Sequence, residues 1–383
     1  MRTFLIILGS LILLGIAALA ALFFYFKNAN KVEITPATSS LITQENITKE
    51  KVDSIFKYTK NFPDNTQLSF AFIDGDTVSY YGILRKEGAL NTVQNSDSIF
   101  QIGSISKVFT STLLADFVYN EKVDLTAPIQ QYLNTPLHNI EKDGKFITLK
   151  SLSNHTSGLP RLPKGMLMNS ILNMDDPYKN YTQDKFEKYL QEKLAPETTP
   201  GTKMAYSNLG VGLLGHILSE VSGKNFETLL QEKIFIPYKM NSSSSLPSIV
   251  ENRLVSGLSP KGDKVPAWTF SSMHGMGAIN SNVEDLAKFA QANFTINNIL
   301  NLQRIKTFEK NEKRSVALGW MIINTKKSNE LYFHNGATGG YMSSMLLDIK
   351  NKKGVIILSN VNFSHPDSKN LDKLCFTLAG MQP

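Results

Sequence analysis

Ser104 and Lys107 have the residue types and the spacing that nucleophilic catalysis requires. Apolar residues recur at helical intervals from Val108 to Tyr119, so both side chains are expected on one face where a helix begins. A lysine amine one turn away can activate the serine hydroxyl, and unpaired N–H groups at a helix N-terminus favour developing negative charge. The pair therefore predicts that Ser104 is a nucleophile and that Lys107 activates it.

A second Ser-x-x-Lys pair, Ser54 and Lys57, shows that this spacing alone is a weak signal. It lies inside Glu50–Thr59, a polar stretch that is expected to form a short surface helix. We therefore interpret Ser54 as part of a solvated face. Ser104 differs because it follows Phe100–Gly103 directly and opens its helix, where a nucleophile would be presented.

Tyr206 and Asn208 form the one Tyr-x-Asn pair that lies in a loop of small residues directly before an apolar, glycine-containing stretch. A tyrosine held near a lysine can have a lowered pKa, because the cation favours the phenolate. Such a tyrosine could relay the proton of the serine. Without a neighbouring nucleophile, a tyrosine in this place is more often a packing residue.

His334-Asn335-Gly336 is the one His-x-Gly sequence in the chain, and it follows a predicted strand. The small residues after it would let a substrate approach the strand backbone. A histidine beside a strand is usually structural, but among the six histidines His334 has the best local context for chemistry.

The N-terminal segment contains an apolar run, Phe4–Phe26, that is long enough to span a bilayer. Residues 1–26 are therefore predicted to be an uncleaved signal anchor; cleavage after Ala18-Leu19-Ala20 is the alternative. Residues 27–48 are polar and are predicted to be a linker, and residues 49–383 are predicted to be a catalytic domain on the outer side of the membrane.

Strand patterns occur at both ends of this domain and helical patterns lie between them, roughly over residues 135–295. Ser281 and Glu284 have the spacing of a capping box, which predicts a helix to Ala292. We expect an α/β fold in which the two ends of the domain complete one sheet. The predicted strands are Leu68–Ile73, Thr77–Leu84, Val316–Ile323, Glu330–Phe333, Tyr341–Ile349 and Val355–Ser359, and a helix over Asp367–Ala379 closes the chain.

The composition argues against several other classes of function. The net charge is +7, but the lysines are scattered and form no run, which gives no support for nucleic acid as a partner. The histidines are dispersed without ligand spacing, so no metal and no cofactor are expected. The one cysteine, Cys375, is expected to be a buried thiol in the C-terminal helix.

The order Ser-x-x-Lys, Tyr-x-Asn, His-x-Gly resembles the serine β-lactamase-like family, which holds class C β-lactamases, D-alanyl-D-alanine carboxypeptidases, D-aminopeptidases and related esterases. Ser153–Pro160, Met276–Ser281 and Leu318-Gly319-Trp320 resemble it too, so the similarity covers roughly residues 50–380. The resemblance implies a β-lactamase/transpeptidase-like fold, with an antiparallel sheet flanked by helices and an inserted, mostly helical domain. It also implies an acyl-enzyme on Ser104.

Carried over motif by motif, the resemblance implies that Lys107 and Tyr206 share the roles of general base and general acid. It also implies that His334 is a catalytic residue. Asn208 would hydrogen-bond the substrate amide. The backbone N–H groups of Ser104 and Ala337 would form an oxyanion hole, next to Gly336.

Two departures from the family pattern bear on the substrate. His334 stands where class C β-lactamases have lysine, so a neutral ring would supply one positive charge fewer near Tyr206. Asn335 stands where threonine is usual, so the hydroxyl that would meet a substrate carboxylate is replaced by an amide. The histidine resembles the carboxypeptidase and esterase branches, and both changes argue against a β-lactamase and leave the choice of substrate open.

Three hypotheses remain open from the sequence. The leading one is a single-pass protein of the bacterial inner membrane whose periplasmic serine hydrolase domain acts on D-amino-acid peptides of peptidoglycan type or on esters. The second is a class C-like β-lactamase. The third is a non-catalytic β-lactam- or peptidoglycan-binding protein of the same fold. A small peptide, β-lactam or ester is the expected partner, and the oligomeric state is left open.

Overall fold

A ten-stranded sheet is the centre of the computed structural model, which describes residues 32–166, 173, 175–324 and 330–381. Neighbouring strands are antiparallel except for the first pair, β1 and β4. In their spatial order, the strands are β1 (Thr38–Ser40), β4 (Ala89–Val93), β3 (Thr77–Lys86), β2 (Gln67–Asp74), β16 (Lys353–Ser359), β15 (Met342–Asp348), β14 (Glu330–Ala337), β13 (Met321–Asn324), β12 (Arg314–Val316) and β11 (Phe308–Asn311).

The pairing of β2 with β16 joins segments from the two ends of residues 49–383, as the sequence predicts. A tight turn at Gly75, which has a φ of 59°, connects β2 to β3 in a hairpin. The prediction of an α/β protein with an antiparallel sheet flanked by helices is thereby confirmed.

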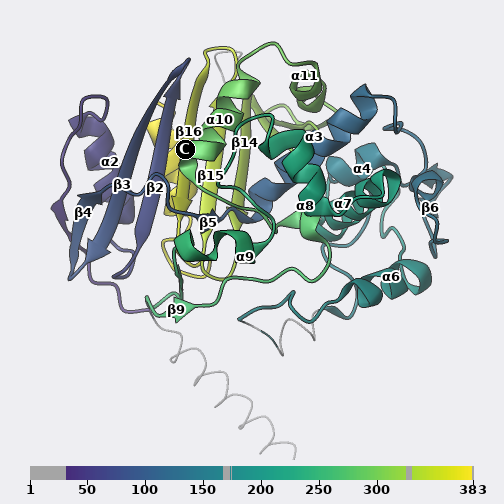
Figure 1. Cartoon of the computed structure of the whole chain (residues 1–383), viewed down its shortest axis with the longest axis horizontal. Coiled ribbons are helices and arrows are strands. Elements are labelled where there is room, and N and C mark those ends of the chain that lie inside the picture. Colours follow the sequence, from purple (N-terminus) through teal and green to yellow (C-terminus); the bar gives the residue numbers. More distant parts are fainter. Residues whose placement is uncertain (1–31, 167–172, 174, 325–329, 382–383) are drawn as a thin grey trace, which may run out of the picture. The chain divides into compact units, whose positions relative to one another are not determined.

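Helices cover both faces of this sheet (Figure 1). α3, α4, α7 and α8 lie on one side, and α10 packs there against β2 and β16, whereas α2 and α12 pack together on the other side. The helices are α2 (Lys49–Thr59), α3 (Ser106–Tyr119), α4 (Leu149–Ser153), α6 (Gln183–Glu192), α7 (Asn208–Ser222), α8 (Phe226–Leu230), α9 (Pro247–Val250), α10 (Val283–Asn293), α11 (Asn298–Arg304) and α12 (Asn370–Leu378).

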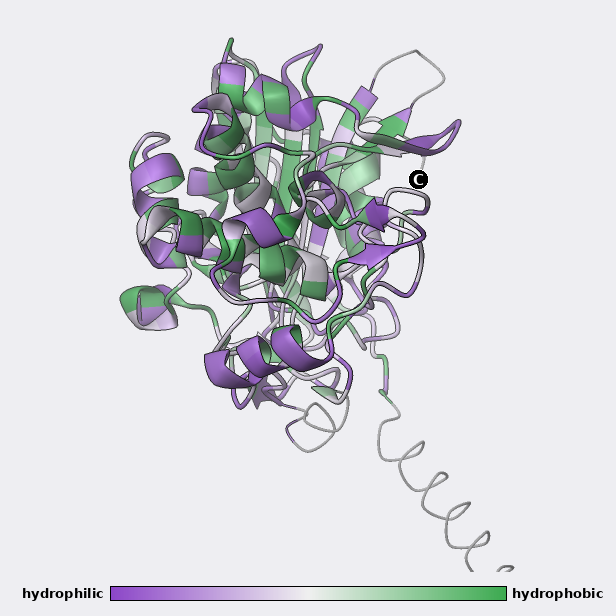
Figure 2. Ribbon diagram, turned by 90° about the vertical axis from the view of Figure 1, so that its right-hand side faces the viewer, coloured by the Kyte–Doolittle hydropathy of each residue, from purple (hydrophilic) through white to green (hydrophobic). Residues whose placement is uncertain are grey.

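Alternation along the central strands separates two hydrophobic cores. On β16, Ile356 packs into the core on the α3 side, while Val355 and Ile357 pack into the core on the α12 side with the buried Cys375. Figure 2 shows hydrophobic residues concentrated along the strands and the helices against them, with hydrophilic residues on outlying segments. Cys375 is therefore a buried thiol, as predicted.

Among the described residues, three short antiparallel pairs lie outside the main sheet. One of them joins β5 (Phe100–Gln101), directly before Ser104, to β10 (Asn280–Ser281). The others are β6 (Glu141–Lys142) with β7 (Lys145–Phe146) and β8 (Gly257–Leu258) with β9 (Lys264–Val265).

Two local predictions were wrong. Val316–Ile323 is not one strand, because the chain turns at Gly319, which has a φ of 72° and packs closely against Ser111 and the Lys107 carbonyl. Ser281 does not cap α10. Asn282 does so by accepting a hydrogen bond from the Asp285 N–H.

The structure describes only part of the N-terminal region for which predictions were made, from residue 32 onwards. Within the predicted linker, Thr38–Ser40 forms the edge strand β1. The predicted anchor, Phe4–Phe26, lies outside the described residues. None of the helices in the part of the chain that the structure describes is long and apolar enough to cross a membrane.

Candidate active site

Ser104 lies in a 3₁₀ turn, Gly103–Ile105, which leads from β5 into α3. Gly103 has a φ of 51°, and a Cβ atom there would stand 2.7 Å from the backbone nitrogen of Ala337 on β14. Only glycine allows this close approach of the two backbones. The turn therefore holds Ser104 directly beside the strand that carries the His-x-Gly sequence.

Lys107 is completely buried one turn after Ser104. Its Nζ atom lies 2.9 Å from Ser104 Oγ and 2.5 Å from the carbonyl oxygen of Met276. Burial, and to a smaller extent the positive charge of Arg161, lower the pKa of Lys107 well below its usual value. The lowered pKa favours the neutral amine, whose lone pair can accept the proton of Ser104.

Tyr206 completes this group, because its hydroxyl is hydrogen-bonded to Ser104 and its ring centroid lies 5.0 Å from Lys107 Nζ. Burial raises the pKa of Tyr206 to about 12, although the Ser104 hydrogen bond and Arg161 act in the opposite direction. The expectation of a lowered pKa was wrong, because desolvation of the phenolate outweighs the nearby cations. Tyr206 is a phenol that can donate a proton.

His334 lies on β14 beneath the site and is almost completely buried. Burial, followed by the influence of Lys107, lowers its pKa to about 4. Its Nδ1 atom lies 2.7 Å from the Asn335 carbonyl oxygen, which can only accept, so Nδ1 carries the hydrogen. His334 is therefore a neutral ring.

The residues after His334 alternate between the two faces of β14. The Asn335 amide donates to Asp372 Oδ2 on α12, 2.7 Å away, so the structure does not bring the Asn335 side chain together with Ser104. Gly336 faces the nucleophile instead, since a Cβ atom there would lie 2.8 Å from the Ser104 nitrogen and 2.0 Å from the Ile102 oxygen.

Ala337 is exposed next to the Ser104 turn. The Thr338 N–H donates to Tyr341 across the β14–β15 turn, and alternation of the ladder directs the Ala337 N–H away from β15. The backbones of Ser104 and Ala337 are thus adjacent, as two donors to one oxyanion would have to be.

Asn208 is the first residue of α7, and Ser207 caps that helix by accepting from the Gly210 N–H. The Asn208 amide is hydrogen-bonded to the Tyr178 hydroxyl, whereas its Oδ1 atom is buried without a hydrogen-bond partner among the described residues. This oxygen is available to accept an N–H from a ligand.

Sequence reasoning missed several residues of the site. The Met276 carbonyl could not be predicted, because any residue type supplies one. Tyr178, Trp268 and Phe270 form an aromatic cluster, with the Tyr178 ring 5.2 Å from Trp268 and 5.1 Å from Phe270. Tyr178 is far in the sequence from Trp268 and Phe270, and the three residues follow no recognisable pattern. Arg161 directly follows the loop Ser153–Pro160, which the sequence analysis singled out only as a resemblance.

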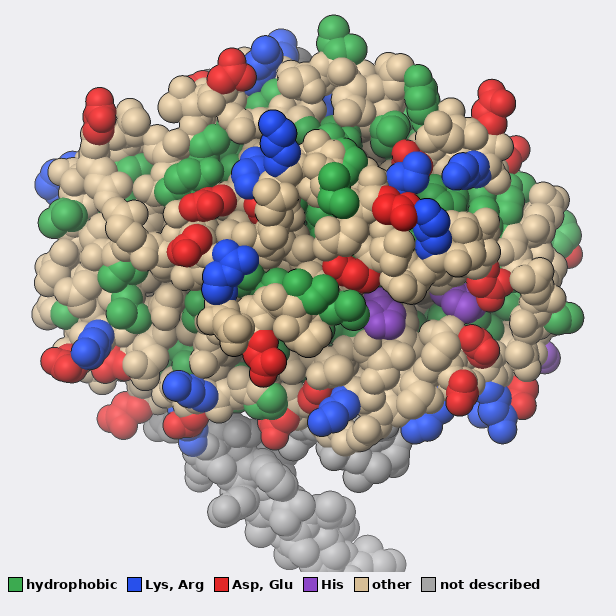
Figure 3. Space-filling model, viewed as in Figure 1, with side chains coloured by type: hydrophobic (Ala, Val, Ile, Leu, Met, Phe, Trp, Pro, Cys, Tyr) green, Lys and Arg blue, Asp and Glu red, His purple; other side chains and the backbone are tan. Residues whose placement is uncertain are grey.

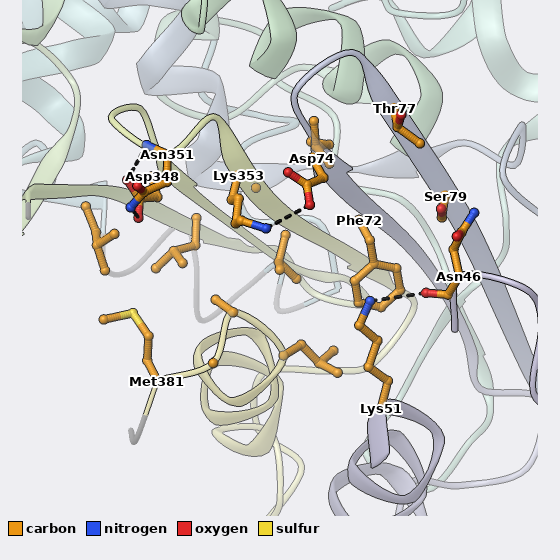
Figure 4. A pocket seen from close by; sticks show the side chains of 18 residues that line it. Asn46, Lys51, Phe72, Asp74, Thr77, Ser79, Asp348, Asn351, Lys353 and Met381 are labelled. Atoms are coloured by element: carbon orange, nitrogen blue, oxygen red, sulfur yellow. Dashed lines mark hydrogen bonds and ion pairs between the residues drawn. The ribbon is translucent and has the colours of Figure 1, made fainter. Parts of the chain in front are cut away.

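A cavity of about 880 Å³ lies on the opposite face of the sheet and is separate from this group of residues. Its charged side chains are paired or solvated: Lys353 contacts Asp74, and Lys51 extends over the Phe72 ring towards Asn46 (Figure 4). No serine nucleophile with a neighbouring buried amine lines it. We therefore assign the chemistry to the Ser104 side.

Comparison with protein families gives a match to the family described as Beta-lactamase, over residues 67–375. Penicillin-binding protein 4* of Bacillus subtilis is 25% identical over 321 residues, covering 75% of this chain and 66% of that protein. The D-alanyl-D-alanine-carboxypeptidase/endopeptidase AmpH of Escherichia coli is 27% identical over 255 residues, covering 65% and 63%. The chain thus spans somewhat less than two thirds of these relatives.

Solved structures confirm the β-lactamase/transpeptidase-like fold. A β-lactamase/D-alanine carboxypeptidase from Yersinia pestis, complexed with citrate, superposes with a TM-score of 0.72 at 22% identity, covering 86% of this chain and 98% of that one. A class C β-lactamase from Rhodobacter sphaeroides gives a TM-score of 0.69 at 19% identity, covering 87% and 99%.

Proposed function

This chain belongs to the β-lactamase family, and we propose that it is a serine hydrolase that works through an acyl-enzyme on Ser104. The observation that carries the proposal is the buried Lys107 amine, whose Nζ atom lies 2.9 Å from Ser104 Oγ. Burial lowers the pKa of this amine and so favours the neutral form, which is the base that a serine nucleophile needs.

The proposed acylation follows from the ionisation of the three groups. Ser104 Oγ attacks the substrate carbonyl carbon, and its proton passes to Lys107 Nζ. The N–H groups of Ser104 and Ala337 stabilise the oxyanion. As the bond to the leaving group breaks, Tyr206 donates its phenolic proton to that group, and the extra proton of Lys107 returns to the Tyr206 oxygen.

Hydrolysis of the acyl-enzyme reverses these roles. Water attacks the acyl carbon and gives up a proton to the Lys107–Tyr206 pair, and the Ser104 oxygen recovers a proton as it leaves. The products are the free acid and the resting enzyme. His334, on β14, remains neutral throughout, because its pKa of about 4 keeps the ring unprotonated near neutral pH.

We propose D-amino-acid peptides of peptidoglycan type, or esters, as substrates. Relatives named as carboxypeptidase and penicillin-binding protein support the peptide. Asn208 Oδ1 supports it too, because it can accept the N–H of an amide in the acyl part. β-Lactam hydrolysis is the second candidate, supported by relatives named β-lactamase. Against it, neither His334 nor Asn335 supplies a cation or hydroxyl for the β-lactam carboxylate.

We also propose that Phe4–Phe26 anchors the protein in the membrane, with the catalytic domain outside the cytoplasm. The length and apolar character of this run support the proposal. Fractionation of the native protein tests it: the protein should remain with the membranes, and a soluble form that begins near Ala21 would show cleavage instead.

The hydrolase proposal is tested by p-nitrophenyl ester turnover in the wild type and in Ser104→Ala, with nitrocefin hydrolysis and D-alanine release measured in parallel. We expect ester turnover that is lost in Ser104→Ala. Turnover that survives the substitution would overturn the proposal. A labelled penicillin that binds Ser104 without any turnover of ester, peptide or β-lactam would favour the binding protein instead.

A further inference from the structure

Arg161 is an exposed cation at the edge of the Ser104 site, and neither the motifs nor the comparisons assign it a role. Its carbonyl oxygen accepts hydrogen bonds from the N–H groups of Asn208 and Leu209, which fixes its backbone at the start of α7. Its guanidinium carbon lies 5.2 Å from the centroid of the Tyr206 ring. The side chain is thus anchored at its base, and its charge lies beside the catalytic phenol.

No carboxylate of the described residues balances this charge. Arg161 takes part in none of the ion pairs within 4.0 Å found in that part of the chain. Its charge acts on Lys107, His155, Tyr178 and Tyr206, and no acidic residue is among the groups that shift the pKa values of these four. Because burial disfavours the charged forms of Lys107, His155 and His334, the exposed Arg161 is the positive charge that the described part of this site presents to a ligand.

The neighbours of Arg161 indicate which part of a substrate it would meet. The oxyanion donors lie on the β14 side of Ser104, whereas Arg161 lies on the α7 side with Asn208. The buried, unpartnered Oδ1 of Asn208 can accept an amide N–H of the acyl part. A group bound by Arg161 would therefore belong to the acyl part of the substrate rather than to its leaving group.

We infer that Arg161 is a specificity residue that binds a carboxylate on the acyl part of the substrate. The inference rests on the proposed acyl-enzyme at Ser104. Guanidinium is suited to the task because its fork of N–H donors matches a carboxylate in a bidentate pair. The aromatic cluster of Tyr178, Trp268 and Phe270 supplies apolar surface beside it, so the substrate class is an acyl group with both apolar surface and an anionic end.

The test compares two chromogenic esters with the same leaving group and the same acyl length, mono-4-nitrophenyl glutarate and 4-nitrophenyl pentanoate. The measured quantity is the ratio of kcat/KM for the acidic ester to kcat/KM for the neutral one, with the Ser104→Ala rate subtracted. A third ester, 3-carboxy-4-nitrophenyl pentanoate, carries the carboxylate on the leaving group.

Arg161→Gln should lower the glutarate-to-pentanoate ratio about tenfold, the size expected for loss of a hydrogen-bonded charge pair. Arg161→Lys should recover part of the ratio, because lysine keeps the charge but not the fork. Lys164→Gln is the matched control: it removes an exposed cation three residues away, paired with Glu197 at 3.9 Å, and should leave the ratio unchanged.

A ratio that Arg161→Gln leaves unchanged would overturn the inference, and so would an equal loss in Lys164→Gln. Loss confined to the ester with the carboxylate on its leaving group would overturn the placement on the acyl side. Failure of the proposed function looks different, because pentanoate turnover would then survive Ser104→Ala in a protein with native Arg161.

The pH profile gives a readout that a merely structural role would not change. Arg161 contributes to the lowered pKa of Lys107, so Arg161→Gln should move the acid limb of kcat/KM for the neutral ester to higher pH. Arg161→Lys should leave that limb near its wild-type position. A limb that shifts equally in both variants would contradict an effect of charge.

Discussion

The Ser104 site and the cavity on the opposite face of the central sheet differ in how their ionisable side chains are accommodated. In the Ser104 site, Lys107, Tyr206 and His334 are buried without counterions among the described residues, and burial shifts the pKa of each towards its neutral form. On the α12 side, Lys353 and Asp74 form an ion pair at 2.7 Å, with 60% and 69% of their side chains exposed. The cavity of about 880 Å³ lies on the α12 side, whereas the proposed catalytic residues lie on the α3 side.

This difference shows that the size of a cavity is a poor guide to the catalytic site in this fold. Catalytic groups often have pKa values that the protein has shifted. Desolvation shifts a pKa where the side chain is buried away from water and from counterions. On the face of the molecule that Figure 3 shows, the charged side chains lie at the surface, with cations and anions interspersed. On β14, His334 faces the Ser104 site, whereas the Asn335 amide donates to Asp372 on the opposite face of the sheet.

The largest effect on activity should come from removing the Lys107 amine. Lys107→Met should lower kcat/KM for p-nitrophenyl esters by about 10³-fold, within the range for loss of a general base. Lys51→Met makes the same substitution on the other face and should leave kcat/KM unchanged. Equal losses in the two variants would mean that the contrast between the faces does not mark the chemistry.

The ionisation of His334 should make the folded state sensitive to acid. Its folded pKa of about 4 lies below the usual value of 6.5, so the unfolded chain binds the proton first, and stability is lost as the pH falls from about 6.5 through about 4. The full contribution is about 3 kcal/mol. Urea unfolding at pH 7 and pH 4 measures it.

His334→Asn is the control for this pH dependence, because it removes the titrating ring. The loss of stability on acidification should be smaller in the variant, though not absent, since burial also lowers the pKa of His155. Equal losses in the wild type and the variant would show that His334 is not held neutral by the fold.

Tyr206→Phe should show whether the phenol acts as a general acid. We expect kcat/KM to fall by about 10²-fold for alkyl esters, whose leaving groups need a proton. The loss should be smaller for p-nitrophenyl esters, which release a stable anion. An equal loss with both leaving groups would assign Tyr206 a positional role.

The smallest effect should follow substitution in the ion pair on the α12 side. Lys353→Met breaks the exposed contact with Asp74 and should change the free energy of unfolding by about 1 kcal/mol or less. Esterase activity should be unchanged. A loss of esterase activity in this variant would indicate that changes in the cavity affect catalysis at Ser104.

The sequence allowed the sheet, its completion by β2 and β16, and the convergence of Ser104, Lys107 and Tyr206 to be predicted, because spacing and chain order carry that information. It did not allow the pKa of Tyr206 to be predicted, since the balance between burial and nearby cations depends on packing. The side chain of Asn335 was misplaced for a related reason: adjacent strand positions face opposite sides. Val316–Ile323 was predicted as one strand because its apolar pattern hides the turn at Gly319.

The central claim, that Ser104 is the covalent nucleophile, is tested most directly by intact mass and peptide mapping after exposure to a fluorophosphonate and to a labelled penicillin. The account predicts a single adduct on Ser104 with the fluorophosphonate, and much slower labelling in Lys107→Met, which lacks the amine 2.9 Å from Ser104 Oγ. Label on Ser54 or on another serine, with Ser104 unmodified, would contradict the account.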